Sequence, residues 1–335
     1  DSDSKEIRTA STNNKVKGES EMNSTGHKKH HYIPVCYLRN FSLDKEIVWV
    51  YNKKVSKCYQ KNINDIFYKK DFYTLDECYI PEGKEEILNS LSVEYDYFAQ
   101  KIEPQYAKFY EFFNPLIEKL TEDKFYRDSL IVFPEEYIEM IAFMMITQHL
   151  RTPKARKYII DLYSQTRVLF KNCVDANISL NGISVEDMKA SLEENAGPVM
   201  TQMLIAFKPE FLKNAVEMLK SKIWSVYIAL EGDFYTSDSP VNIEFTDDSG
   251  HDFMGINERG TILTYPVSRK VLVRLWDREK FQKDFALYDR IPRYVDKEYV
   301  KSENTFQYGW ATEIVGPTKD VNMYRAIKKY TGKEL

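Results

Sequence analysis

Residues 134–153, PEEYIEMIAFMMITQHLRTP, decide the fold of this chain. Pro134 and the two glutamates after it are typical of a helix start, because negative charge is favoured in the first turn. Apolar side chains then recur at steps of three or four residues, which predicts a helix with one buried face. Thr152 suits the N-cap of a second helix and Pro153 its first position, so we expect a tight corner between two helices.

Helical patterns extend on both sides of this corner. Upstream, residues 85–113 carry apolar side chains near helical spacing, and Pro104 is expected to break or kink that helix. Downstream, amphipathic segments run to about residue 220, with an interruption at Gly197 and Pro198. The middle of the chain is therefore predicted to be mostly helical.

Strand patterns lie outside this helical middle, in segments rich in β-branched and aromatic residues. Near the start, residues 46–54 predict a strand, and residues 71–77 predict a weaker strand or an extended connection. Helices are expected again at about residues 297–309 and 318–331. The later strands are predicted at residues 222–230, 233–238, 260–267 and 270–276.

These patterns predict a single α+β domain over residues 30–335. It has a mostly helical middle, a small N-terminal strand element and a small antiparallel C-terminal sheet, and no linker rich in Pro, Gly or Ser divides it. Residues 1–29 are polar with almost nothing to bury. We interpret them as a disordered arm, or as an extension that is not native.

The composition argues against several broad classes. The chain has 47 basic and 51 acidic residues and a net charge of −4, so no global basic field attracts nucleic acid. No apolar run approaches the roughly 18 residues of a membrane span, and no leader is visible. The four cysteines lack metal-ligand spacing and suit a reducing compartment, so we expect a cytoplasmic protein. P-loop, GxGxxG, HExxH and GxSxG motifs are absent.

Three of the five histidines, His27, His30 and His31, stand just before an apolar segment. Imidazole titrates near neutral pH and is a common general acid, general base or metal ligand. Neighbouring side chains on an extended segment point to opposite sides, so one site cannot easily hold both His30 and His31. We expect His31, which is nearer the apolar segment, to face inward. The alternative is a polar arm with surface histidines.

Further positions could carry chemistry, each with a purely structural alternative. Gln148 and Arg151 share one face at a helix end, and arginine grips phosphate or carboxylate. Arg151 could instead bond the last carbonyls of its own helix. Asp238 follows a strand, where catalytic carboxylates often lie, but Asp-Ser-Pro is also a common turn. Glu94 is a carboxylate on an aromatic-rich helix, or part of the solvated face of that helix.

Seven short segments together resemble one family. HHYIPVCYLRNF, VWVYNKK, DFYT, QHLRTPKAR, YTSDSPV, LTYPVS and NMYRAIKKY follow, in this order, the pattern of the bacterial family called domain of unknown function 4238, over about residues 30–331. Val35 departs from that pattern, because the family typically has Gln or Arg there. The resemblance implies no activity. It implies that these residues occupy family motif positions: His30, His31, Pro34, Gln148, Arg151, Thr152, Asp238 and Pro240.

If these residues converge, they bring together imidazole, guanidinium, carboxamide and carboxylate groups, which suit phosphodiester chemistry. Our first hypothesis is a nuclease or related phosphodiesterase, in a bacterial effector or defence protein. A divalent metal is a candidate cofactor. The candidate residues by role are catalytic His31, Asp238 and Arg151, substrate-binding Gln148, His30 and Arg39, and metal-ligating His31, Asp238 and Glu94.

Two other functions fit the same residues. A non-catalytic module could hold a nucleotide or a nucleic-acid strand through Arg151 and the many tyrosines, by ion pairing and stacking. A structural or partner-binding protein could use the motifs only for its fold, which the slightly acidic balance favours over broad nucleic-acid affinity. The sequence leaves the oligomeric state open.

Overall fold

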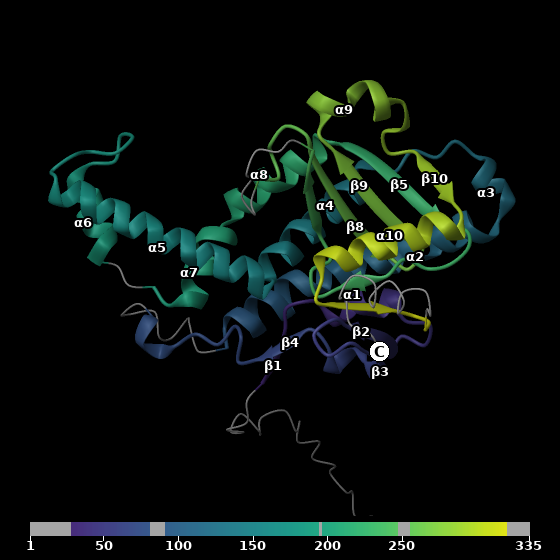
Figure 1. The fold of residues 1–335 in the computed structure, drawn as a ribbon, viewed down its shortest axis with the longest axis horizontal. Helices are drawn as coiled ribbons and strands as arrows, with labels where there is room; N and C mark the ends of the chain where they lie inside the picture. Colours follow the sequence, from purple (N-terminus) through teal and green to yellow (C-terminus); the bar gives the residue numbers. More distant parts are fainter. Residues whose placement is uncertain (1–27, 81–90, 194–195, 247–254, 320–335) are drawn as a thin grey trace, which may run out of the picture.

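The computed structural model describes residues 28–80, 91–193, 196–246 and 255–319. A helical layer covers a five-stranded sheet, and a second, four-stranded sheet lies beside it (Figure 1). The predicted α+β class is confirmed, with its helical middle and C-terminal sheet. Within the described part, no helix is both long and apolar enough to cross a membrane.

The chain enters the fold through β1 (Lys29–His31), which pairs antiparallel with β4 (Tyr68–Lys70). β1 begins at Lys29, so the predicted arm of residues 1–29 overlaps the first strand by one residue. Residues 1–27 of that arm lie outside the described part. This short pair of strands fixes where the two neighbouring histidines lie.

Residues 71–77 form no strand, so of the two structures expected there the connection is the one observed. The backbone leaves β4 at Asp71 with a φ of 52°, a left-handed conformation that ends an extended run. Both polar atoms of the Phe72–Tyr73 peptide group bond to side chains of other elements rather than to a strand: the Phe72 carbonyl accepts from Arg156, and the Tyr73 N–H donates to His30.

The four-stranded sheet joins the two ends of the described chain. Its strand order is β3-β2-β11-β6, and every pair in it is antiparallel. Val50 lies opposite Val315, so β2 and β11 run side by side although they are far apart in sequence (Figure 1). The strands are β2 (Ile47–Asn52), β3 (Lys57–Asn62), β6 (Thr236–Ser237) and β11 (Glu313–Gly316).

The five-stranded sheet has the order β10-β5-β9-β8-β7. Every residue of β5 and β8 is buried, as expected for strands covered on both faces. The pairs are antiparallel except β10–β5, which is parallel and was not predicted. The strands are β5 (Ile223–Ala229), β7 (Asn242–Phe245), β8 (Thr261–Ser268), β9 (Val271–Trp276) and β10 (Pro292–Val295).

Most predicted helices are confirmed, with one change of type. Pro104 does not break its helix but lies where the π-helix η4 (Val93–Ile102) becomes the α-helix α2 (Glu103–Glu122). Of the helix predicted at 318–331, all but two residues lie outside the described part. The other α-helices are α1 (Val35–Leu38), α3 (Lys124–Asp128), α4 (Glu135–Arg151), α5 (Pro153–Asp175), α6 (Val185–Glu193), α7 (Pro198–Ala206), α8 (Pro209–Lys220), α9 (Arg278–Phe285) and α10 (Lys297–Trp310). The remaining helical turns are η1 (Arg39–Phe41), η2 (Ile63–Asp65), η3 (Glu77–Tyr79) and η5 (Ala286–Tyr288).

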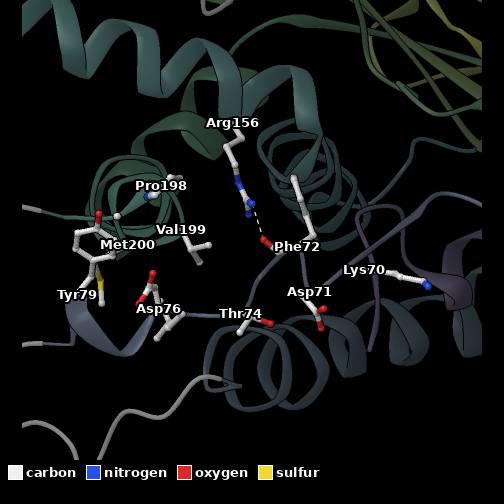
Figure 2. A pocket seen from close by; sticks show the side chains of 12 residues that line it. Lys70, Asp71, Phe72, Thr74, Asp76, Tyr79, Arg156, Pro198, Val199 and Met200 are labelled. Atoms are coloured by element: carbon white, nitrogen blue, oxygen red, sulfur yellow. Dashed lines mark hydrogen bonds between the residues drawn. The ribbon is translucent and has the colours of Figure 1, made fainter. Parts of the chain in front are cut away.

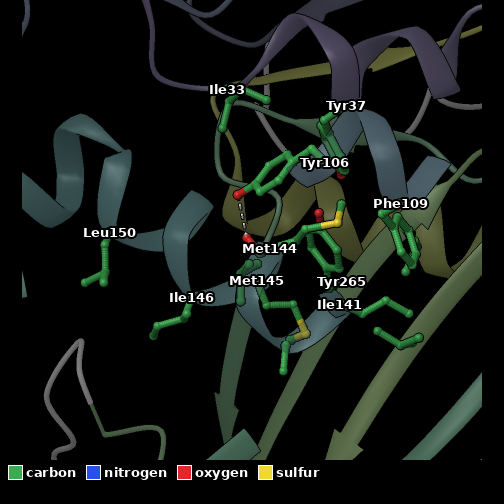
Figure 3. Packing of buried hydrophobic residues seen from close by; sticks show 14 of the residues in the cluster. Ile33, Tyr37, Tyr106, Phe109, Ile141, Met144, Met145, Ile146, Leu150 and Tyr265 are labelled. Carbon is green, nitrogen blue, oxygen red and sulfur yellow. Dashed lines mark hydrogen bonds between the residues drawn. The ribbon is translucent and has the colours of Figure 1, made fainter. Parts of the chain in front are cut away.

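The corner between α4 and α5 is built as the sequence predicts. The Thr152 hydroxyl donates to His149 O at 2.9 Å and accepts from Ala155 N–H at 3.2 Å, so one side chain bonds the end of α4 and the start of α5. The part of α4 that precedes this corner packs into the main core against α2 and β8 (Figure 3). Tyr106 donates to the Met144 carbonyl there, which holds α2 against α4.

Candidate functional site

The segments around the two histidines and the α4–α5 corner meet at Tyr73, which is fully buried. Its backbone N–H donates to His30 Nδ1 at 2.8 Å, and its hydroxyl donates to the Arg151 carbonyl at 2.8 Å. The guanidinium carbons of Arg151 and Arg156 lie 5.7 and 5.1 Å from the centre of its ring. Tyr73 therefore ties β1, the segment after β4 and the helix corner together.

The inward-facing histidine is His30, so the expectation that His31 faces inward is wrong. His30 is 1% exposed, and its ring stacks on Tyr73 with centroids 6.1 Å apart. Alternation along β1 turns His31 the other way, half-buried against Tyr68 of β4. Because His30 Nδ1 accepts a hydrogen bond, its ring is neutral with the proton on Nε2. Burial lowers the pKa of His30, which favours that neutral form.

His31 presents one free basic nitrogen. Its Nε2 lies 3.2 Å from the Asn64 carbonyl oxygen, so Nε2 carries the proton and Nδ1 is the basic atom. Burial lowers the pKa of His31, and the Asn64 contact raises it in part. At neutral pH the ring is therefore mostly uncharged and able to accept a proton.

Arg151 is completely buried and bonds to two other elements rather than to its own helix end. Its Nη2 donates to the His31 carbonyl at 2.7 Å and to Glu103 Oε1 at 3.0 Å. Its guanidinium carbon lies 4.1 Å from the centre of the Phe98 ring, close enough for a cation–π interaction. Among the described residues, its Nε and Nη1 have no hydrogen-bond partner.

Glu94 completes a group with Arg151, Glu103 and His31, which we call the Arg151 cluster. Burial raises the pKa of Glu94 to about 7; the Arg151 charge opposes this effect and the Glu103 charge adds to it. Glu94 Oε2 is enclosed and has no partner within the residues that the structure describes. The structure thus brings together three predicted residues: His31, Glu94 and Arg151.

Glu103 was not predicted, because helix type decides its position. Nine residues separate it from Glu94, which in an α-helix places the two on opposite faces. The intervening turns are π-helical, with hydrogen bonds reaching five residues back, so nine residues make about two full turns. Both carboxylates therefore face Arg151. A periodicity analysis that assumes an α-helix cannot find this pair.

The remaining predicted residues lie elsewhere. Gln148 is fully buried and donates to the Tyr265 hydroxyl at 2.8 Å, so it ties α4 to β8. Asp238 accepts from the N–H groups of Thr312 at 2.9 Å and Glu313 at 3.3 Å, which fixes the start of β11. Burial raises the pKa of Asp238, although those N–H groups lower it. Arg39 is an exposed residue at the start of η1.

The predicted metal ligands are not gathered in one place. His31 and Glu94 belong to the Arg151 cluster, whereas Asp238 lies at the four-stranded sheet. Across the described ranges, no group of three or more His, Cys, Asp or Glu side chains is placed to hold a metal ion.

The fold and the Arg151 cluster define an α+β protein in which the motif segments that carry His31 and Arg151 meet at one buried group of charges. A family model described as "Protein of unknown function (DUF4238)" matches residues 29–317. The chain belongs to that family, which confirms the resemblance seen in the sequence. A search of curated proteins and a search of solved structures each gave no match.

Proposed function

We propose that this protein hydrolyses phosphodiester bonds by acid–base catalysis at the Arg151 cluster. The observation that carries the proposal is that one buried guanidinium, that of Arg151, acts electrostatically on both the half-buried His31 imidazole and the Glu94 carboxyl group, whose pKa is about 7. Enzymes use groups that titrate near the working pH because such groups both accept and donate protons readily. The positive charge of Arg151 suits a reaction whose transition state gathers negative charge on phosphate oxygens.

Each residue has a distinct role in this reaction. His31 Nδ1 accepts the proton of the attacking water or hydroxyl, and the protonated Glu94 carboxyl donates a proton to the leaving oxygen. Arg151 is a positioning residue, because it holds the His31 carbonyl and the Glu103 carboxylate and is itself inaccessible. We propose a nucleic acid as the substrate and the cytoplasm as the compartment, where the four free cysteines stay reduced. A role in a bacterial effector or defence system is part of the same proposal.

The test is cleavage of end-labelled single- and double-stranded RNA and DNA by the purified chain, with magnesium, with manganese and with EDTA. Glu94→Gln removes the acid at nearly constant shape and should reduce the rate by about 100-fold or more. Glu111→Gln, on the exposed face of α2, is the matched control and should keep the rate. Equal rates for Glu94→Gln and the wild-type chain, or no cleavage of any substrate, contradict the proposal.

A further inference from the structure

A pocket of about 370 Å³ lies between the segment after β4 and helices α5 and α7. This volume is in the range of small-molecule sites. Figure 2 shows the Arg156 side chain reaching from α5 toward the space bordered by Phe72, Val199 and Thr74. None of these residues was among the candidates taken from the sequence, although Arg156 lies in the QHLRTPKAR segment.

Arg156 is held rigidly, and none of the described residues neutralises its charge. It is 9% exposed; its Nε donates to Gln202 Oε1 at 2.6 Å, and its Nη1 donates to the Phe72 carbonyl. Its guanidinium carbon lies 3.5 Å from the centre of the Phe72 ring. Gln202 is fixed in turn, because its Nε2 donates to the Leu150 carbonyl at 2.6 Å. In the part of the chain that the structure describes, no carboxylate pairs with Arg156, and its Nη2 has no hydrogen-bond partner.

A second unpaired polar atom lines the same pocket. Thr74 Oγ1 is enclosed and also lacks a partner among the described residues. Leaving a buried guanidinium uncompensated is unfavourable, and so is leaving a buried hydroxyl unpaired. Both groups are hydrogen-bond donors, and one is positively charged. An anionic oxygen group in the pocket satisfies both.

The opposite wall is apolar and aromatic. Val199 and Met200 line it, together with the Tyr79 ring. That ring packs directly on Gly197, where an added Cβ would lie 2.3 Å from a Tyr79 ring carbon, so the close approach requires glycine. Aromatic and apolar surfaces of this kind stack against a planar base.

The charges on the rim limit how much negative charge the ligand carries. Asp71 and Asp76 line the pocket beside Lys70 and Arg156, so the charges of these four side chains sum to zero. A polyphosphate would place several charges beside two carboxylates, whereas a single phosphate meets one guanidinium. One phosphate group is the better match.

We propose that this pocket binds a nucleoside monophosphate, with its phosphate on Arg156 Nη2 and Thr74 Oγ1 and its base against the Tyr79 and Met200 wall. The binding site is distinct from the Arg151 cluster and requires no turnover there. Donation by Nη2 of a fixed guanidinium, together with donation by the Thr74 hydroxyl, gives the phosphate both charge and geometry.

Isothermal titration calorimetry on the full chain tests the proposal with AMP, GMP, CMP, UMP, the four nucleosides and inorganic phosphate. We expect at least one monophosphate to bind, and its nucleoside to bind at least about tenfold more weakly because it lacks the charged hydrogen bonds. Absence of binding by all four monophosphates at millimolar concentration overturns the assignment. Inorganic phosphate that binds as tightly as every nucleotide overturns it as well.

Variants locate the binding. Thr74→Val keeps the shape and removes one donor, so affinity should fall about tenfold. Arg156→Met should abolish binding, with thermal melting as a check on folding. Arg259→Met, at an exposed arginine, is the control and should bind as the wild-type chain does. Binding that survives both pocket variants would falsify the site. Because the readout is binding, failure of hydrolysis at the Arg151 cluster leaves this result intact.

Discussion

Single side chains hold the candidate site together through bonds to backbone groups. Tyr73 bonds both His30 and the Arg151 carbonyl, and Arg151 bonds the His31 carbonyl. Each bond satisfies a buried polar group that has no strand or helix partner at that point. Polar residues here therefore replace regular secondary structure. This arrangement makes individual substitutions informative.

Tyr73→Phe should lower the free energy of unfolding by about 1–3 kcal/mol. The change removes the hydroxyl that donates to the Arg151 carbonyl and leaves that buried acceptor unpaired. Urea denaturation at neutral pH measures the difference. Tyr95→Phe, at a side chain that is 63% exposed, is the matched control and should be neutral within about 0.5 kcal/mol. Equal stability for both variants contradicts the role given to Tyr73.

Glu94→Gln should change how stability depends on pH. In the folded chain burial raises the pKa of Glu94 from 4.5 to about 7. The folded chain therefore binds this proton more tightly than the unfolded chain does. The stability linked to the proton is complete below pH 4.5 and is lost as pH rises through 7. Relative to the glutamine variant, the wild-type chain should therefore lose up to about 3 kcal/mol over that range. Denaturation at several pH values measures it; a constant difference between the two chains contradicts the raised pKa.

Secondary structure elements are held in register by close contacts as well as by hydrogen bonds. At the end of β11, Gly316 packs against the Tyr235 ring, and an added Cβ would lie 2.5 Å from two ring carbons. Tyr235 is itself buried, so its ring has little space to move. This contact fixes the position of β11 in the four-stranded sheet.

Gly316→Ala should reduce stability by about 1–3 kcal/mol, because the methyl group overpacks the contact with Tyr235. Gly309→Ala is the control, and its effect on stability should have the opposite sign. Gly309 lies in α10 with nothing within 4 Å of the added Cβ, so alanine should stabilise the helix by about 0.5–1 kcal/mol. Thermal and urea unfolding of the two variants measure both effects. A stable Gly316→Ala protein would show that β11 can shift.

Secondary structure that is determined by residues within a few positions of each other could be predicted from the sequence. Secondary structure that depends on partners far away in the sequence could not. The α4–α5 corner follows from Thr152 and Pro153, because a cap and a first-turn proline act within a few residues. The absence of a strand at 71–77 depends on Arg156 and His30, because their side chains bond the Phe72 carbonyl and the Tyr73 N–H. The parallel pairing of β10 likewise depends on β5, far away in sequence.

The same distinction applies to the candidate site. His31, Glu94 and Arg151 could be chosen by residue type and spacing, and the fold brings them together. Glu103 joins them only because η4 is a π-helix, which the sequence pattern does not reveal. In the sequence, Arg156 is one of several basic residues in the amphipathic segment that follows the corner. Its significance comes from burial without a countercharge among the residues that the structure describes, which only the packed structure shows.

At the scale of the whole molecule, burial is uneven. In α4, eleven residues are buried, whereas in α5 the buried residues are Ala155, Arg156 and Ile159, all in its first part. The rest of α5 packs on α6 and α7 and projects with α6 away from both sheets (Figure 1). Few buried contacts support this projecting pair of helices. Its local stability should therefore be lower than that of the core.

Hydrogen exchange should separate the two regions. Amides in residues 162–175 are expected to exchange at least roughly a hundredfold faster than those in residues 144–150, because opening them exposes little apolar surface. Mass spectrometry of peptides from α4 and α5 in one sample measures both rates under the same conditions. Similar protection in the two segments would show that α5 opens only together with the core.

The pairing of β2 with β11 also has a consequence during synthesis. Val50 emerges from the ribosome early, but its partner Val315 is made last among the described strands. Until then one edge of β2 carries unpaired peptide groups, which can associate with strands of other chains. The four-stranded sheet therefore closes only after almost all of the described chain has been translated. We therefore expect the nascent chain to be most prone to association at this early hairpin.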